Sequence, residues 1–164
     1  PDPPAQPFGA QGTRWAVFGG GIAMDGNDAT DLSGFAQASW FIVDNVELGG
    51  ELAIWNFDQT GQDAVGGSVS ALVRWHFVNE GRLSLFVDGG IGLMGATDEV
   101  PEGGTDFNFL PRAGVGGTWR PWDSDLRILM GLRWHHISNA RYSGAEDNPS
   151  RDGAMLYLGL GVPF

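Results

Sequence analysis

Large apolar residues alternate with small or polar residues along most of this chain, and this period of two most constrains its fold. In segment 65–78, one set of alternate positions holds mainly valine, tryptophan and phenylalanine, whereas the other set includes serine, arginine and histidine. In segment 153–164, leucine recurs at every second position from Leu156 to Leu160. Successive side chains of a β-strand point to opposite faces, so the alternation predicts strands.

The same pattern extends over eight segments. They are 12–24, 32–43, 46–57, 65–78, 82–95, 106–119, 125–138 and 153–164. Each is long enough for a tilted strand that crosses a bilayer, which needs about 9–11 residues. Helices are disfavoured, because the 27 glycines of the chain are spread through the apolar stretches and each glycine inside a helix costs about 1 kcal/mol. We expect an irregular, proline-rich lead-in over residues 1–11 and a single barrel domain over 12–164.

The two faces of these strands differ in a way that indicates which one meets lipid. An eight-stranded barrel has an interior just wide enough for side chains to fill it. Glycine, serine and a few charged residues suit that interior, and the large apolar face then suits lipid. Buried charges are tolerated when they are paired. We expect the interior residues Glu47 and Glu51 to pair with arginines of the same face, namely Arg74, Arg112, Arg127 or Arg133. The alternative is a soluble, lipocalin-like barrel with its large apolar residues inside.

The connections between the segments alternate in length. The odd-numbered connections are long and acidic: 25–31, 58–64, 96–105 and 139–152. The even-numbered connections are short: 44–45, 79–81 and 120–124. Long loops at one end and short turns at the other are typical of outer-membrane barrels. We therefore predict an all-β, eight-stranded antiparallel up-and-down outer-membrane β-barrel, located in the bacterial outer membrane.

Aromatic residues near the ends of the segments support this prediction. Outer-membrane barrels carry aromatic girdles at both membrane interfaces. We expect six tryptophans in such girdles: Trp15, Trp40, Trp55, Trp75, Trp119 and Trp134. The chain ends in Phe164, and a terminal aromatic residue on an alternating strand resembles the assembly signal of bacterial outer-membrane proteins.

Composition excludes several classes of protein. The net charge is −11 and all 9 basic residues are arginine, so we expect no nucleic-acid partner, because phosphate contacts need a basic cluster. The chain has no cysteine, which excludes disulfides, thiolate zinc sites and cysteine nucleophiles. No apolar run approaches 18 residues, so a transmembrane helix is excluded. Because the chain begins at Pro1 and not at methionine, we expect that a signal peptide has been removed.

Segment 133–141 carries the residues best suited to chemistry. The last two outward positions of strand 125–138 are His136 and Ser138. Residues two apart in a strand share a face at a spacing of about 6.6 Å, so these side chains are able to lean together and form a hydrogen bond. A serine nucleophile needs such a neutral imidazole to accept its proton. Asn139 follows directly and is able to donate its amide to an oxyanion.

The run His136-Ile-Ser-Asn-Ala140 resembles the His-x-Ser-Asn-Ala signature of the PagL-like lipid A 3-O-deacylases, an acyloxyacyl hydrolase-type family of outer-membrane β-barrels. In that family the signature lies on the penultimate strand of an eight-stranded barrel. An Asn-Pro or Asn-Asp-Gly turn and a short last strand follow. Here Asn148-Pro149 and Asp152-Gly153 take these places. The resemblance in fold covers the whole chain, and the resemblance in specific residues covers roughly the last thirty.

The resemblance implies a role for each residue of the signature. Ser138 would be the nucleophile, His136 the general base and Asn139 an oxyanion donor. The substrate would be the ester-linked 3-hydroxyacyl chain of lipid A in the outer leaflet, so lipopolysaccharide and outer-membrane lipids are the expected partners. No cofactor is implied. The remaining histidines fall on the interior face, and histidines on different faces do not form a metal site.

One position departs from the family. The family completes its triad with a glutamate at the start of the last strand, where counting along this chain leads to Met155 or Ala154. Neither is an acid. We expect Asp152, and after it Glu146, to be the group that orients His136.

The missing glutamate also leaves a second function open. A non-catalytic outer-membrane barrel with a structural, adhesive or self-associating surface role would keep the motif by descent. The intact histidine, serine and asparagine favour the enzyme, whereas the missing glutamate favours this alternative. The apolar outer face is compatible with a homo-oligomer under either interpretation.

Overall fold

The computed structural model describes residues 7–26, 29–121, 123–144 and 148–164. Its strands are β1 (Arg14–Asp25), β2 (Thr30–Val43), β3 (Val46–Asp58), β4 (Ala64–Glu80), β5 (Leu83–Ala96), β6 (Phe107–Phe109), β7 (Arg112–Trp119), β8 (Arg127–Ile137) and β9 (Arg151–Pro163). None of the residues described forms a helix long and apolar enough to span a membrane.

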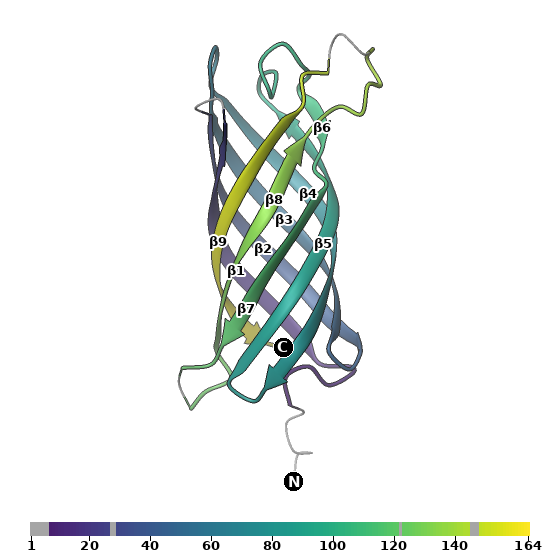
Figure 1. The fold of residues 1–164 in the computed structure, drawn as a ribbon, viewed down its shortest axis with the longest axis vertical. Helices are drawn as coiled ribbons and strands as arrows, with labels where there is room; N and C mark the ends of the chain where they lie inside the picture. Colours follow the sequence, from purple (N-terminus) through teal and green to yellow (C-terminus); the bar gives the residue numbers. More distant parts are fainter. Residues whose placement is uncertain (1–6, 27–28, 122, 145–147) are drawn as a thin grey trace.

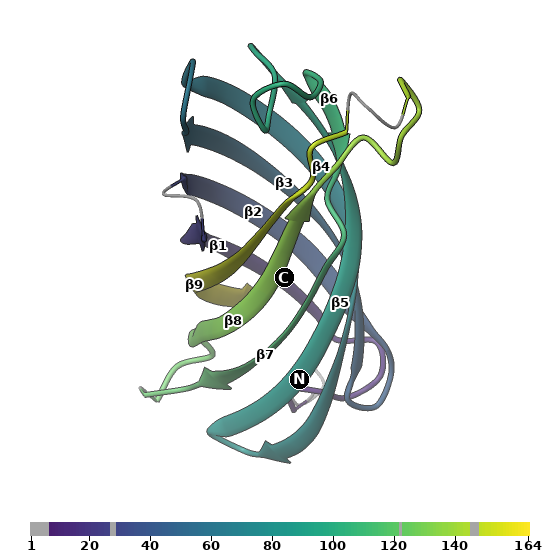
Figure 2. The same cartoon turned by 45° about the horizontal axis from the view of Figure 1, so that its top comes forward.

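The strands close into one antiparallel barrel (Figure 1). Successive strands pair from β1 to β5 and from β7 to β9, and β9 returns to pair with β1. Figure 2 shows β9 between β1 and β8. Since β6 and β7 both pair with β5 and follow each other along the chain, they are two parts of one barrel strand. The prediction of an eight-stranded antiparallel up-and-down barrel is confirmed.

The sixth predicted strand is interrupted at Leu110 and Pro111. Leu110 exchanges both of its backbone hydrogen bonds with Gly92, at 2.9 and 3.0 Å. Proline has no N–H to donate, so the regular ladder stops at Pro111. The carbonyl of Pro111 still accepts the backbone N–H of His136 at 3.3 Å. At the interruption, the end of β8 therefore stays hydrogen-bonded to the residues between β6 and β7.

The two faces of the wall are divided as the alternation predicts. Large apolar side chains of the predicted lipid face are exposed, for example Ile54, Val65, Ile91 and Leu156, with 55 to 72% of their surface accessible. A soluble barrel would bury such residues. The outward face is therefore that of a membrane barrel.

The interior is filled by paired charges. Glu47 accepts a hydrogen bond from Arg74 at 3.0 Å, and Glu51 accepts one from Arg112 at 2.6 Å. Asp88 lies between two arginines, at 3.4 Å from Arg74 and 2.8 Å from Arg133. The pairs predicted for Glu47 and Glu51 are thus confirmed.

Arg127 is the one of the four candidate arginines that binds neither Glu47 nor Glu51 in the part of the chain described. Its guanidinium lies 3.9 Å from the centre of the Phe8 ring and donates to the Thr118 hydroxyl at 3.1 Å. Phe8 reaches this place because residues before β1 fold into the end of the barrel, where its ring packs against Trp15 and Phe41. The guanidinium also donates to the backbone carbonyls of Gly81 and Arg82, so a ring and neutral oxygens surround it in place of a carboxylate.

Small residues make room for the large ones inside the barrel. Gly131 of β8 lies opposite Tyr157 of β9, and a Cβ at Gly131 would lie 2.3 Å from the Tyr157 hydroxyl oxygen. The tyrosine ring therefore lies over Gly131 on the inner face of β8, and its hydroxyl donates to Asp88 at 3.4 Å. The guanidinium carbon of Arg133, on β8, lies 4.0 Å from the centre of the Tyr157 ring.

The girdle prediction is wrong for two tryptophans. Trp15 and Trp55 are 7% and 3% exposed and lie inside the barrel. Trp55 follows the inward parity of β3, donates to the Ser68 hydroxyl at 2.9 Å and stacks on His135 at 5.0 Å. The other four of the six, Trp40, Trp75, Trp119 and Trp134, face outward.

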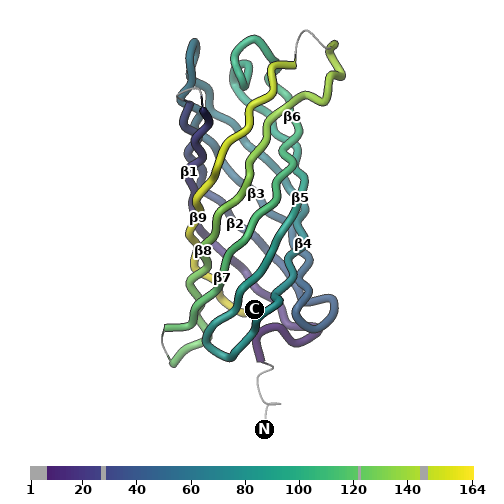
Figure 3. The backbone as a smooth tube through the Cα atoms, in the orientation of Figure 1, coloured from purple at the N-terminus to yellow at the C-terminus, as the bar shows by residue number. Residues whose placement is uncertain are grey.

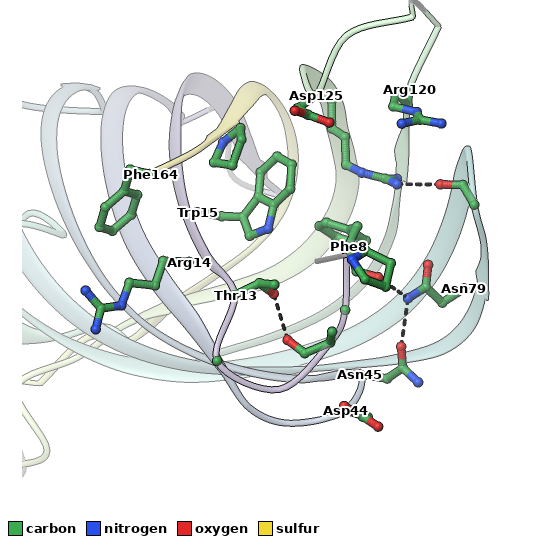
Figure 4. A pocket seen from close by; sticks show the side chains of 17 residues that line it. Phe8, Thr13, Arg14, Trp15, Asp44, Asn45, Asn79, Arg120, Asp125 and Phe164 are labelled. Carbon is green, nitrogen blue, oxygen red and sulfur yellow. Dashed lines mark hydrogen bonds between the residues drawn. The ribbon is translucent and has the colours of Figure 1, made fainter. Parts of the chain in front are cut away.

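The two ends of the barrel are different. Figure 3 shows that β1 begins and β9 ends at the end that carries the short turns, which we call the short-turn end (connections 44–45, 81–82 and 120–126). A hollow of about 850 Å³ opens there around Phe8, Arg14 and Asn79 (Figure 4). Asn79 donates to the Phe8 carbonyl at 2.9 Å and holds the lead-in against the barrel. The opposite, long-loop end carries segment 133–141.

The interior charge pairs yield a prediction about stability. Asp88→Asn leaves the buried Arg74 and Arg133 without their shared carboxylate, and we expect a loss of about 3 kcal/mol in the free energy of unfolding. Urea unfolding of the detergent-folded barrel, followed by tryptophan fluorescence, measures it. The matched control is Asp123→Asn, because Asp123 pairs with Arg82 on the exposed surface and such pairs contribute at most about 1 kcal/mol. Equal stability of the two variants would contradict this account.

Candidate active site

His136 and Asp152 meet on the outward face at the long-loop end. The imidazole Nδ1 of His136 lies 2.8 Å from Oδ1 of Asp152, so Nδ1–H donates to the carboxylate. The same oxygen accepts the indole N–H of Trp134 at 2.7 Å. The His136 side chain is 19% exposed and that of Asp152 is 56% exposed. The carboxylate therefore fixes which ring nitrogen of His136 carries the proton and leaves Nε2 as the acceptor.

The register of β8 against β9 creates this contact. His136 is the direct partner of Asp152, and Trp134 is the direct partner of Ala154. Strand β9 begins at residue 151, two residues before the predicted boundary, so Asp152 is a strand residue with outward parity. Met155 has the opposite parity and is 2% exposed inside the barrel. Of the two family positions reached by counting, only that of Ala154 shares the face of His136.

Ser138 lies just beyond the end of β8. It forms an isolated bridge with Phe109, in which Phe109 N–H donates to the Ser138 carbonyl at 2.8 Å and Ser138 N–H donates back at 3.2 Å. Within the described ranges, the Ser138 hydroxyl makes no hydrogen bond to His136, although the two share a face. The reason is geometric: the bridge draws Ser138 towards β6, whereas Asp152 draws the imidazole towards β9.

Asn139 lies on the inward side of the chain and is 1% exposed. Its side-chain oxygen accepts the backbone N–H of Arg141 at 2.8 Å, and its own N–H donates to the Asn148 side chain at 2.9 Å. Ala140 and Arg141 both have positive φ, at 52° and 65°. Asn139 therefore shapes a tight turn directly after Ser138. In the part of the chain that the structure describes, the Ala140 N–H of this turn has no hydrogen-bond acceptor.

Glu146, the second acid expected to orient His136, lies outside the described residues. Among those described, no three histidine, aspartate or glutamate side chains converge to hold a metal ion.

Arg151 anchors the start of β9 from inside the barrel. Its guanidinium lies 2.6 Å from Asp31 and 3.6 Å from Asp25, and it also donates to the Gln59 side chain. These groups are buried. Because neighbouring residues of a strand point to opposite faces, the inward anchor at Arg151 sets the place of Asp152 on the outward face.

Comparison with known proteins identifies the family. Residues 29–161 match the sequence profile of the family described as lipid A 3-O-deacylase (PagL). This match spans the barrel from the start of β2 to near the end of β9 and includes all the residues of the candidate site. The chain belongs to the PagL family. The resemblance noted for residues 136–140 is therefore confirmed at the level of the family.

Solved structures resemble this PagL-family chain in fold. The outer membrane enzyme PagL matches with a TM-score of 0.69 and 16% identity, over 87% of this chain and 97% of its own. Neisserial surface protein A gives 0.62 and 15%, over 92% and 94%. The N-terminal β-barrel domain of Pseudomonas aeruginosa OprF gives 0.59 and 16%, over 93% and 98%. Identities this low show a shared outer-membrane barrel fold alone. Curated protein sequences gave no significant match.

Sequence reasoning placed Trp134 in the aromatic girdle and missed its bond to Asp152. The available signal was parity, since Trp134 lies two residues before His136 on the same face. The register that brings Asp152 within reach of both depends on where β9 begins, which alternation alone does not give.

The interior anchor yields a prediction about local stability. Arg151→Met removes the charge that holds Asp31 and Gln59, and we expect amide hydrogen exchange at residues 152–154 to become at least about tenfold faster. Exchange in the centre of β9 should stay unchanged. Mass spectrometry of peptides from the folded barrel measures both regions. Arg141→Met, at an exposed loop position, is the control, and equal exchange in both variants would show that Arg151 is not an anchor.

Proposed function

We propose that this protein is an outer-membrane serine esterase that removes an ester-linked 3-hydroxyacyl chain from lipid A in the outer leaflet. The observation that carries the proposal is the hydrogen bond from His136 to Asp152. It lies on the lipid-facing side of β8, and His136 precedes Ser138 by two residues. Family membership supports the same substrate class. A site on this face at the long-loop end is reached by a molecule that itself lies in the leaflet.

The reaction begins with attack of the Ser138 hydroxyl oxygen on the ester carbonyl carbon. Nε2 of His136 takes the hydroxyl proton, and Asp152 stabilises the imidazolium through Nδ1–H. The tetrahedral intermediate collapses, the ester C–O bond breaks, and His136 gives the proton to the departing sugar oxygen. Water then attacks the acyl-enzyme with the same proton shuttle, which releases a 3-hydroxy fatty acid and restores Ser138.

Asn139 and the turn it shapes supply the oxyanion donors in this proposal. An oxyanion is stabilised by preorganised N–H groups. The Ala140 N–H is one such group, since it follows Ser138 within the turn and, over the described residues, has no acceptor. The bond from Arg141 N–H to the Asn139 side chain keeps the turn in its left-handed conformation. Asn139 therefore serves the oxyanion through this turn, since its own side chain is buried on the inward side.

Aromatic side chains beside Ser138 suit an acyl chain. Phe109, the bridge partner of Ser138, packs against Phe107 with ring centres 5.9 Å apart, and Phe107 packs against Tyr142 at 6.2 Å. Phe107 and Tyr142 are 40% and 57% exposed. Their rings offer apolar surface next to the nucleophile, where a hydrocarbon chain gains from burial.

This function places the protein in the bacterial outer membrane, with lipopolysaccharide as its partner. The long-loop end would face the outside and the short-turn end the periplasm, as in other outer-membrane barrels.

The nucleophile is tested by Ser138→Ala. We expect deacylation of purified lipid A, measured as loss of one 3-hydroxyacyl mass after incubation with the detergent-folded protein, to fall by about 10³-fold or more. The barrel should remain folded, because one hydroxyl without a partner among the residues described contributes little to stability. Ser143→Ala, an exposed serine of the adjacent connection, is the matched control. Full activity in Ser138→Ala would reject the assignment.

The orienting acid is tested by comparing Asp152→Asn with Glu146→Gln. We expect Asp152→Asn to lower kcat by about 10²-fold, because an amide does not stabilise the imidazolium, while Glu146→Gln retains activity. The effect is smaller than for a buried triad acid because the Asp152 side chain is half exposed to solvent. Asp106→Asn, at another exposed acid, controls for loss of surface charge. The reverse result would assign the role to Glu146.

The second candidate, a non-catalytic barrel with a structural, adhesive or self-associating role, is favoured by one observation: Ala154 stands at the outward family position of the acid. The same lipid A experiment separates the two functions. A folded wild-type barrel that leaves lipid A intact would reject the esterase and favour this candidate.

A further inference from the structure

One carboxylate oxygen serves two donors at the candidate site. Oδ1 of Asp152 lies 2.8 Å from Nδ1 of His136 and 2.7 Å from the indole Nε1 of Trp134. The rings of Trp134 and His136 lie side by side, with centres 5.3 Å apart and planes inclined by 33°. The three side chains therefore form one cluster, which we call the Trp–Asp–His cluster (Trp134, Asp152 and His136).

The exposure of Asp152 makes a second donor important. Its side chain is 56% exposed, and ion pairs at such sites gain little, because water competes and side-chain freedom is lost. An aspartate that orients a catalytic histidine has to hold a single rotamer against this competition. The indole N–H supplies a fixed donor, since the tryptophan ring has few rotatable bonds and is packed against the imidazole.

The residue opposite Trp134 gives the indole its room. Ala154 is the direct cross-strand partner of Trp134 on β9, and directly opposite side chains start about 4.5–5.5 Å apart. The alanine methyl group is small and leaves the outer surface of β9 open to the indole. The indole therefore reaches Asp152, the outward residue that precedes Ala154 on β9. The alanine at position 154 and the contact of Trp134 with Asp152 therefore belong to one arrangement.

We propose that Trp134 is a positioning residue, which holds Asp152 in the rotamer that orients His136. The indole is a donor with no acceptor capacity, so it takes no proton in the reaction. Hydrogen bonds donated to a carboxylate favour its ionised form, which is the form that stabilises the imidazolium. This inference rests on the proposed esterase function for its effect on rate, but the contact itself is measurable without activity.

Trp134→Phe is the test variant, because it keeps an aromatic ring in the membrane interface and removes the N–H. We expect kcat to fall about tenfold while KM stays unchanged, since the indole acts on the orientation of His136 and not on the lipid. In the Asp152→Asn background the same change should cost nothing further, because the group that Trp134 positions is already lost. Trp119→Phe, an outward tryptophan at the short-turn end, is the matched control.

Nuclear magnetic resonance gives a readout independent of catalysis. In ¹⁵N-labelled, detergent-folded protein, we expect the His136 Nδ1–H resonance to be sharp in the wild type. It should be exchange-broadened in Trp134→Phe and unchanged in Trp119→Phe. If Trp134→Phe does not fold, Ala154→Leu replaces it, because the larger side chain displaces the indole and leaves Trp134 in the chain.

The outcomes separate the two claims. Broadening of the His136 resonance together with a lower kcat supports both. If Trp134→Phe broadens the resonance but the folded wild-type protein never deacylates lipid A, the esterase is rejected and the positioning contact is kept. An unchanged His136 resonance in Trp134→Phe overturns the positioning role, whatever happens to kcat. Equal losses in Trp134→Phe and Trp119→Phe also overturn it, because they show a general effect of the aromatic girdle.

Discussion

The paired charges inside the barrel are the interaction on which the rest of this structure depends. An eight-stranded wall leaves so little room that glycines and ion pairs fill the interior, and the large apolar side chains are turned outward to lipid. Asp88 joins Arg74 of β4 and Arg133 of β8 across that interior. A buried guanidinium without a carboxylate is costly, so these pairs fix the strands against one another. The register between the strands that carry these residues is held by this constraint.

The candidate site uses that fixed register on the other side of the same strands. On β8, Arg133 and His135 point inward while Trp134 and His136 point outward. On β9, Arg151 is tied to the interior by Asp31 and its neighbour Asp152 faces His136. Every outward member of the Trp–Asp–His cluster thus follows or precedes a residue anchored inside. A rigid wall, not a loop, places these side chains, which is the more precise way to hold a functional group.

Alternation predicted the barrel because parity is a local property of strands. It assigned the lipid face, the interior partners of Glu47 and Glu51, and the shared face of His136 and Ser138. It did not place Trp15 and Trp55 inside, because a large aromatic residue near a strand end suits either a girdle or a core. It also did not give the interruption at Pro111 or the start of β9, since both depend on pairing with strands distant in sequence. For the same reason, alternation alone left more than one candidate for the acid that faces His136.

Cross-strand geometry explains why Asp152 reaches His136 with a short side chain, whereas position 154 is further away. Directly opposite residues have Cβ atoms about 4.5–5.5 Å apart, whereas diagonal neighbours are about 7–8 Å apart. Asp152 is directly opposite His136, so a short side chain suffices. An acid at position 154 would lie diagonally and would need the longer reach of glutamate. The small side chain of Ala154, directly opposite Trp134, leaves room for the indole that reaches Asp152. In this barrel, the bond from His136 to Asp152 and the indole contact with the same carboxylate both follow from the register of β8 against β9.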